Sequence, residues 1–198
     1  MYPFRETADP YRVLVSEILL RKTTARQVAN IYGEFFAKFP TVEDLCRARL
    51  EEIIEIIKPL GIVTRANDLL LAAKTIVQEY KGTVPSDKDL LTQLRGVGRY
   101  IANCVLSFGY GKTVPMVDSN VERVLSRVSN LPTNKQGAKG EFWQIYSELA
   151  PIKKRREFHY ALIDLAHKIC TPRSPKCSDC PISRCCKYPC AHASHSTS

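Results

Sequence analysis

Four cysteines near the C-terminal end of the 198-residue chain have the spacing of a metal or cluster site. Cys170, Cys177, Cys180 and Cys186 are separated by six, two and five residues. A single C-x-x-C between two outlying cysteines differs from the paired C-x-x-C motifs of a zinc ribbon, and iron–sulfur clusters are held by four cysteine thiolates in such runs. The spacing therefore predicts a 4Fe–4S cluster, with zinc as the alternative.

The spacing leaves the fourth ligand open, because Cys185 and Cys186 are adjacent and Cys190 lies close behind them. We predict Cys186. A disulfide framework is not expected, since it belongs to small secreted domains and the chain shows neither a signal peptide nor a transmembrane run. Cys46 and Cys104 sit among apolar residues, where a free cysteine behaves as a small hydrophobic side chain.

Two carboxylates stand at positions where an acidic side chain has a use. Glu17 lies in the apolar helical stretch 11–20, where the burial of an unpaired carboxylate is costly. Asp118 precedes Ser119 and Asn120 at a good helix start, so its simplest role is that of an N-cap. A capping carboxylate is also held in a fixed orientation, and Asp118 is therefore a candidate for both capping and chemistry.

A glycine-rich turn, Gly96-Val97-Gly98, separates two stretches with helical patterns in the middle of the chain. Glycine lets the backbone take turn conformations and lets its N–H groups approach a phosphate closely, while the following helix adds the positive end of its dipole. Such a helix-hairpin-helix grips DNA without reading its sequence. A G-x-G turn is more often a plain connection, but Arg95, Arg99 and the formal net charge of +9 favour a phosphate-binding turn.

The elements that must position these residues are helices. Apolar residues recur at helical spacing through most of the chain, and no segment shows a convincing run of alternating strand residues. Asp9-Pro10, Thr41 and Pro85-Ser86 are helix-start signals. Hydrophobic residues make up 44% of the chain, enough for one or two compact domains, and the pI near 9.2 predicts a polyanionic partner such as nucleic acid.

Together the hairpin, the segment 115–124 and the four-cysteine run resemble the helix-hairpin-helix DNA glycosylases typified by endonuclease III and the adenine-DNA glycosylases. The resemblance covers nearly the whole chain. It implies an all-α fold in which a six-helix domain carrying the hairpin, residues 11–111, and a second helical domain carrying the cluster, residues 1–10 and 112–198, flank a DNA-binding cleft. The polar tail 191–198 is expected to be disordered.

Within this family the residue at position 100 separates two kinds of enzyme. Endonuclease III-like members carry a lysine there, and its amine attacks C1′ of the sugar to form a Schiff base. Tyr100 cannot do this, so the resemblance implies a monofunctional glycosylase that removes a base with little or no strand cleavage. Glu17 matches a glutamate of the adenine and thymine mismatch branches, where it contacts the flipped base or handles its proton.

The substrate branch is predicted from two short stretches. Adenine glycosylases have glutamines where this chain has Arg21 and Lys22, and two aromatic wedge residues where it has Ile62 and Val63. The chain also ends soon after the cysteines, without the domain through which adenine glycosylases recognise 8-oxoguanine. It is therefore most similar to the archaeal thymine-DNA mismatch glycosylases, which remove thymine or uracil opposite guanine.

The breakage of an N-glycosidic bond passes through a transition state with positive charge on the sugar, so a carboxylate beneath the ring and a proton for the leaving base are useful. The predicted catalytic residues are Asp118, Glu17 and Tyr100. The base must first leave the stack, which costs least for a mispair. The predicted DNA contacts, each with a plain structural alternative, are the hairpin residues Gly96, Val97, Gly98 and Arg99, the wedge candidates Ile62 and Val63, Arg21 or Lys22 near the opposite guanine, and Arg173 and Lys176 in the cluster loop.

The sequence thus predicts a monomeric, cytoplasmic, nucleoid-associated enzyme that binds double-stranded DNA containing a mispair and has no membrane partner. The cluster is assigned a structural role, which is to hold the basic loop in shape. Two other classes stay open: an adenine glycosylase without its recognition domain, acting opposite guanine or 8-oxoguanine, and a non-catalytic DNA-binding iron–sulfur protein. The last has no use for Asp118 and Glu17 at their matching positions.

Overall fold

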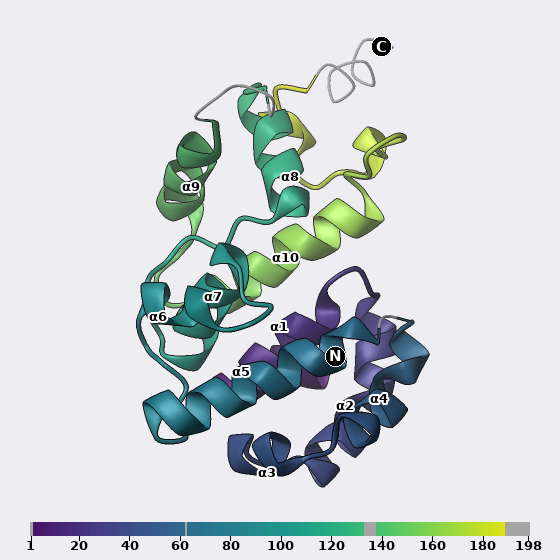
Figure 1. Ribbon diagram of the computed structural model, residues 1–198. Coiled ribbons are helices and arrows are strands. Elements are labelled where there is room, and N and C mark those ends of the chain that lie inside the picture. Colours follow the sequence, from purple (N-terminus) through teal and green to yellow (C-terminus); the bar gives the residue numbers. More distant parts are fainter. Residues whose placement is uncertain (1, 62, 133–137, 189–198) are drawn as a thin grey trace, which may run out of the picture. The chain divides into compact units, whose positions relative to one another are not determined.

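The computed structural model describes residues 2–61, 63–132 and 138–188, which fold into helices joined by short turns (Figure 1). No strand forms within these residues, and the all-α prediction is confirmed. None of the described helices is long and apolar enough to cross a membrane. The α-helices are α1 (Pro10–Leu20), α2 (Ala25–Lys38), α3 (Val42–Arg47), α4 (Leu50–Ile57), α5 (Thr64–Tyr80), α6 (Lys88–Gln93), α7 (Arg99–Cys104), α8 (Ser119–Ser129), α9 (Ala138–Leu149) and α10 (Arg155–Lys168).

The chain divides into two compact units, Met1–Thr113 and Val114–Ser198. The first unit includes a short 3-10 turn, Pro3–Arg5, which packs against α1 and α2. Phe4 is 4% exposed there, and its ring centroid lies 6.4 Å from that of Tyr32 on α2. The resemblance places residues 1–10 in the cluster-bearing domain, and that assignment stays a prediction.

In the first unit, α1 is a buried central helix that packs against α2, α5 and α7. Its residues Ile18 and Leu19 are fully buried, and Figure 1 shows the long α5 running beside it. Asp9 caps α1 by accepting the Tyr11 N–H at 2.8 Å, with Pro10 at the first helical position. Thr41 caps α3 by accepting the Asp44 N–H at 3.2 Å, and the Asp44 side chain accepts the Thr41 N–H in return. These local start signals, which satisfy the first N–H groups of each helix, therefore determine where the helices begin.

In the second unit, α8 packs against both α9 and α10 (Figure 1). Phe142 and Tyr146 of α9 are fully buried. Val121 and Val124 of α8 are at most 1% exposed. The loop that follows α10 carries the cysteines and contains two 3-10 turns, Cys177–Asp179 and Ser183–Cys185. The second unit thus joins the segment around Asp118 and the cysteine loop through a shared helical core.

Candidate active site and cysteine loop

The predicted helix-hairpin-helix is present, with α6 and α7 joined by the turn 94–98. Gly96 has a φ of +80°, a left-handed conformation that favours glycine. Gly98 has an ordinary φ of −97°, and a Cβ built there would meet no atom within 4 Å. The packing of the fold therefore does not explain the glycine at position 98, which leaves the outer face of the turn open to close approach by another molecule.

The other predicted hairpin residues differ in exposure. Val97 is 6% exposed, and its N–H donates to the Leu94 carbonyl at 3.1 Å. Its contribution is therefore to shape the turn from the core side. Arg99, the first residue of α7, is exposed, as is Arg95 on the other side of the turn. The hairpin thus exposes the side chains of Arg95 and Arg99 and the backbone at Gly98 to solvent.

Two predicted catalytic residues lie in the first unit. Tyr100 is the second residue of α7 and is half-buried. Glu17, near the end of α1, is only 7% exposed. Carboxylates are rarely buried to this extent, because the transfer of a charged group out of water costs on the order of several kcal/mol. Glu17 is therefore a functional candidate on its burial alone.

The segment that follows α1 holds two more predicted DNA contacts. Lys22 is exposed and has a φ of +54°, a left-handed conformation that costs a residue other than glycine about 1 kcal/mol or more. Arg21, the residue before it, donates from Nη1 to Asp68 Oδ2 at 3.0 Å and to the Gly96 carbonyl at 3.2 Å. Of the two wedge candidates, Val63 is 45% exposed and Ile62 lies outside the described residues.

In the second unit, Asp118 is the N-cap of α8. Its Oδ1 accepts the backbone N–H groups of Asn120 at 3.0 Å and Val121 at 2.8 Å, and its Oδ2 accepts from Asn120 Nδ2 at 2.9 Å. The capping role is therefore present. The Asp118 carboxylate is half-buried, and these three hydrogen bonds fix its orientation. Its negative charge is therefore held in one position.

A chain of hydrogen bonds connects Asp118 to the cysteine loop through residues that the sequence reasoning did not single out. Asn120 Oδ1 accepts from Arg123 Nη1 at 3.3 Å and from Nη2 at 3.2 Å. Arg123 Nε in turn donates to the carbonyl of Cys170 at 2.9 Å, and its Nη2 donates to Ala166 O at 3.0 Å. Arg123 thus ties the orientation of Asn120, and through it Asp118, to the first cysteine.

The four predicted ligands line one small cavity in the second unit, namely Cys170, Cys177, Cys180 and Cys186. Burial separates the two adjacent cysteines, since Cys186 is 9% exposed whereas Cys185 is exposed and donates to the Ile182 carbonyl. Cys190 lies outside the described residues. The predicted four thiols therefore line the same cavity, and the exposed Cys185 is not part of its lining.

Arg127 lies one helical turn after Arg123, on the same face of α8, and that spacing is a signal that the sequence reasoning missed. Its Nη1 donates to Cys170 Sγ at 3.3 Å and to Thr171 O at 2.8 Å. Its guanidinium also stacks over the Tyr188 ring at 4.7 Å from the centroid. Arg127 thus holds Cys170 and the start of the cysteine loop against α8.

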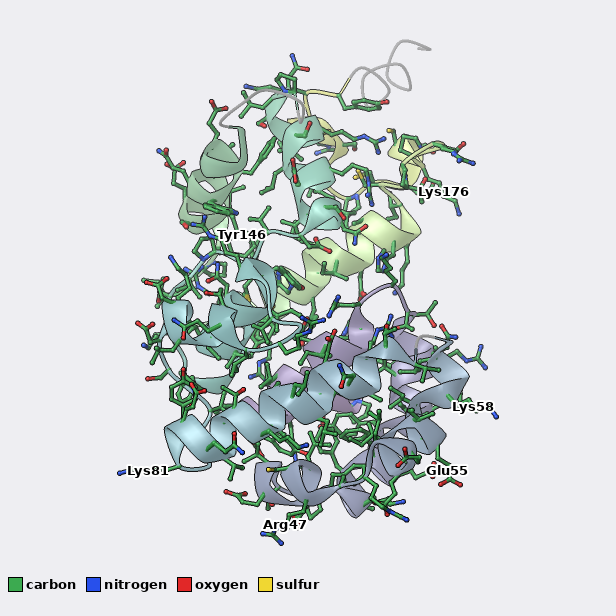
Figure 2. The ribbon with its side chains drawn as sticks, viewed as in Figure 1. Arg47, Glu55, Lys58, Lys81, Tyr146 and Lys176 are labelled. Atoms are coloured by element: carbon green, nitrogen blue, oxygen red, sulfur yellow. The ribbon has the colours of Figure 1, made fainter. Side chains whose placement is uncertain are left out.

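Burial raises the pKa of the Cys186 thiol, a hydrogen bond from the Tyr188 backbone N–H partly offsets this, and the neighbouring Cys170, Cys180 and Cys185 raise the pKa as well. Such crowding of thiols is relieved when a metal ion or cluster supplies positive charge. The basic residues of the same loop, Arg173 and Lys176, are exposed, and Lys176 points away from the ribbon in Figure 2.

A family model described as HhH-GPD superfamily base excision DNA repair protein matches residues 15–148, two thirds of the chain. The chain belongs to the HhH-GPD superfamily. The matched segment contains the hairpin and the three predicted catalytic residues, Glu17, Tyr100 and Asp118.

Relatives within the HhH-GPD superfamily include a thymine-DNA glycosylase of Aeropyrum pernix, 42% identical over 94% of this chain and 86% of that protein. A thymine/uracil-DNA glycosylase of Methanothermobacter thermautotrophicus is 38% identical, with the same shares covered. An adenine DNA glycosylase of Buchnera aphidicola subsp. Baizongia pistaciae is 31% identical over 93% of this chain but only 53% of that protein. This HhH-GPD chain is therefore a DNA glycosylase, a hydrolase of N-glycosyl bonds.

The fold agrees with this HhH-GPD membership. The solved structure of a thermostable thymine-DNA glycosylase has a TM-score of 0.87 and 37% identity, and the match covers 95% of this chain and 88% of that one. Endonuclease III-like members of the superfamily generally contain a 4Fe–4S cluster. Among the described residues no three His, Cys, Asp or Glu side chains are arranged as a metal-binding group, although the four thiols line one cavity. That donor set, four thiols beside a guanidinium, fits an iron–sulfur cluster.

Proposed function

We propose that this DNA glycosylase is monofunctional and hydrolyses the N-glycosidic bond of thymine or uracil opposite guanine. Similarity carries the proposal, since thymine- and thymine/uracil-DNA glycosylases are 42% and 38% identical to the chain over 86% of their length, whereas two adenine DNA glycosylases are 31% and 34% identical over 53% and 33% of theirs. Tyr100 in place of a lysine supports the absence of a Schiff-base step. A monomer in the cytoplasm remains our prediction for its state and location.

The proposed chemistry uses two carboxylates for two different charges. Asp118, held by three hydrogen bonds, stabilises the positive charge that develops on the sugar as the bond to the base breaks. Glu17, buried at the end of α1, protonates or hydrogen-bonds the leaving base. Water then attacks C1′, because no amine stands at position 100.

The bound DNA is proposed to contact the exposed basic and apolar residues of the first unit. The hairpin turn and Arg99 grip the backbone, Val63 enters the space that the flipped base leaves, and Lys22 faces the opposite guanine. In the second unit, Arg173 and Lys176 contact phosphates. Selection begins with flipping, because a T·G mispair costs less to open than a paired base.

A panel of labelled duplexes tests the substrate. We expect single-turnover release of thymine from T·G and uracil from U·G, detected as strand breaks only after alkali. Adenine opposite guanine or 8-oxoguanine should react at least about tenfold more slowly, because a pocket discriminates between unlike bases by more than 1.4 kcal/mol. Faster adenine removal would make the chain an adenine glycosylase, and release of no base at all would leave a DNA-binding protein.

Position 100 tests the monofunctional mechanism. Tyr100→Lys places an amine on α7 where bifunctional enzymes have their nucleophile, so borohydride should trap a covalent adduct of this variant with a U·G duplex. Tyr100→Phe is the matched control and should give no adduct, like the parent protein. Trapping of the parent would mean that another lysine attacks the sugar, and the monofunctional mechanism would be wrong.

We propose that Cys170, Cys177, Cys180 and Cys186 hold a 4Fe–4S cluster, which when bound keeps the basic loop with Arg173 and Lys176 in one conformation. The lining of a single cavity by these four thiols supports the ligand set, and the hydrogen bond that Arg127 donates to Cys170 Sγ holds the first of them in place. The residues around them, Arg123 and Arg127, then act by orienting the loop against α8.

The adjacent cysteines give a matched test of that site. Purified without air, the parent protein and Cys185→Ser should both be brown with a broad band near ~400 nm, since thiolate-to-iron charge transfer needs only the four ligands. Cys186→Ser should lose most of the colour and most of the bound iron. Colourless parent protein that contains one zinc would contradict the cluster, and loss of colour in Cys185→Ser alone would exchange the ligand assignment.

A further inference from the structure

One carboxylate, Asp68, joins three segments of the first unit that are far apart in the sequence. It lies in the second turn of α5, and its Oδ2 accepts from Arg21 Nη1 at 3.0 Å. Its Oδ1 accepts from Arg95 Nε at 3.2 Å. Because Arg21 follows α1 and Arg95 belongs to the hairpin turn, Asp68 holds both segments to α5 with one oxygen for each arginine.

The hairpin turn also rests directly on Asp68. A Cβ at Gly96 would lie 2.9 Å from Asp68 Cβ and 3.0 Å from its Cγ and Oδ2, which is closer than side chains approach one another. Arg21 Nη1, which donates to Asp68, donates a second hydrogen bond to the Gly96 carbonyl at 3.2 Å. The turn, the arginine and the carboxylate therefore form one packed cluster, and glycine at position 96 is needed for that contact as well as for its φ of +80°.

An acidic residue beside a DNA-binding turn would by itself repel phosphate. Here the Asp68 side chain is only 16% exposed, whereas Arg21 is 45% exposed and Arg95 66% exposed. The three side chains have a formal charge of +1, and the cations are on the outside. The Asp68 carboxylate accepts hydrogen bonds from Arg21 Nη1 and Arg95 Nε. The other guanidinium nitrogens of these two arginines have no hydrogen-bond partner within the described part of the chain.

A buried arginine, Arg65, holds the end of α1 next to this cluster. It is 2% exposed, its Nη1 donates to the Leu19 carbonyl at 3.0 Å, and its Nη2 meets no partner among the described residues. Burial lowers the pKa of Arg65, the neighbouring Arg21 lowers it further, and Asp68 raises it. Arg65 thus fixes the end of α1, from which Arg21 extends, and adds to the positive field there.

We propose that Asp68 is a positioning residue that holds Arg21 and Arg95 as a preformed grip for a backbone phosphate beside the hairpin turn. The inference rests on the proposed function, because the phosphate belongs to the bound duplex. It changes the role predicted for Arg21: this residue contacts the backbone, and Lys22, which follows it in a left-handed conformation, is the residue for the opposite guanine.

A phosphate contact and a base contact have different signatures. We expect Arg21→Gln to reduce the slope of log affinity against log salt by about 0.9, the value for one phosphate, which near 0.1 M salt is a loss of about eightfold. The loss should be equal for a T·G duplex with a hydrolysis-resistant 2′-fluorothymidine and for a T·A duplex. Lys22→Gln should instead weaken the T·G duplex more than the T·A duplex.

Asp68→Asn tests the positioning by the sign of its effect. If Asp68 were a bystander, removal of its negative charge would tighten DNA binding; if it holds the arginines, binding should weaken by about threefold or more and the salt slope should fall. In a protein that already carries both Arg21→Gln and Arg95→Gln, the further change Asp68→Asn should have little effect on DNA affinity. The carboxylate acts through those two side chains, so its effect disappears with them.

Arg47→Gln is the matched control for the loss of one arginine. Arg47 is 75% exposed on α3, pairs with an aspartate at 3.9 Å and points outward in Figure 2. Its replacement should leave the salt slope unchanged, and thermal unfolding of each variant should stay cooperative. An Arg21→Gln variant with the parent's slope but a changed ratio of T·G to T·A affinity, or tighter binding by Asp68→Asn, would overturn the inference. Neither result depends on excision of a base, which the duplex panel measures separately.

Discussion

Replacement of Asp118 by asparagine is expected to lower the single-turnover rate of thymine excision by about a hundredfold or more, while the duplex still binds. Asparagine caps a helix about as well as aspartate, so the N–H groups of Asn120 and Val121 keep an acceptor. What the variant loses is the negative charge that stabilises the sugar in the transition state. Excision is followed with labelled T·G and U·G duplexes, and binding by fluorescence anisotropy.

Asp87→Asn is the control for this variant. Asp87 caps α6 with the same geometry, accepting from Asp89 N at 2.8 Å and Leu90 N at 3.1 Å, and it has no proposed role in the reaction. Its excision rate should stay within about twofold of the parent's, since a conservative exposed substitution away from the chemistry changes stability by about 0.5 kcal/mol or less. Near-normal excision by Asp118→Asn would reduce Asp118 to a helix cap.

The orientation of Asp118 explains why a cap can also be a catalytic group. Its carboxylate receives three hydrogen bonds, and Asn120, one of the donors, is itself held by Arg123. Arg123 is anchored to the carbonyls of Cys170 and Ala166. A charge fixed in this way needs no reorganisation when the transition state forms, which is the largest contribution that such groups make.

Local chemistry could be predicted from the sequence. Asp9, Thr41 and Asp118 each cap the helix that their neighbours predict, because capping depends on an oxygen two or three residues before an N–H group. The all-helical fold followed from apolar spacing, and Gly96 follows from the need for a turn with positive φ. Family membership required the motifs together, since a G-x-G turn alone is weak.

Contacts between distant segments could not be predicted. Arg21 meets Asp68 across 47 positions, and Arg123 meets Cys170 across 47 as well. Nothing local in either pair indicates the partner, because tertiary packing decides which helix ends meet. The choice between Cys185 and Cys186 was also open in the sequence, and burial distinguishes them only once the loop has folded. The catalytic and DNA-contact roles themselves remain predictions for the variants proposed above.

Replacement of Glu17 by glutamine is the second change for which we expect a large effect. Glutamine has the same shape and can still hydrogen-bond in the buried site, where Glu17 is 7% exposed, but it cannot transfer a proton. If Glu17 assists departure of the base, thymine excision should fall by about a hundredfold, the lower range for general acid–base catalysis.

The leaving base decides whether Glu17 acts as proposed. 5-Fluorouracil departs more readily as an anion than thymine does and needs less help from an acid, so the defect of Glu17→Gln should shrink at least about tenfold on a 5-fluorouracil·G duplex. The defect of Asp118→Asn should not shrink, because Asp118 stabilises the sugar whichever base leaves. An equal defect of Glu17→Gln on both bases would mean that Glu17 holds the flipped nucleotide or the end of α1 in place, and its role in proton transfer would be wrong.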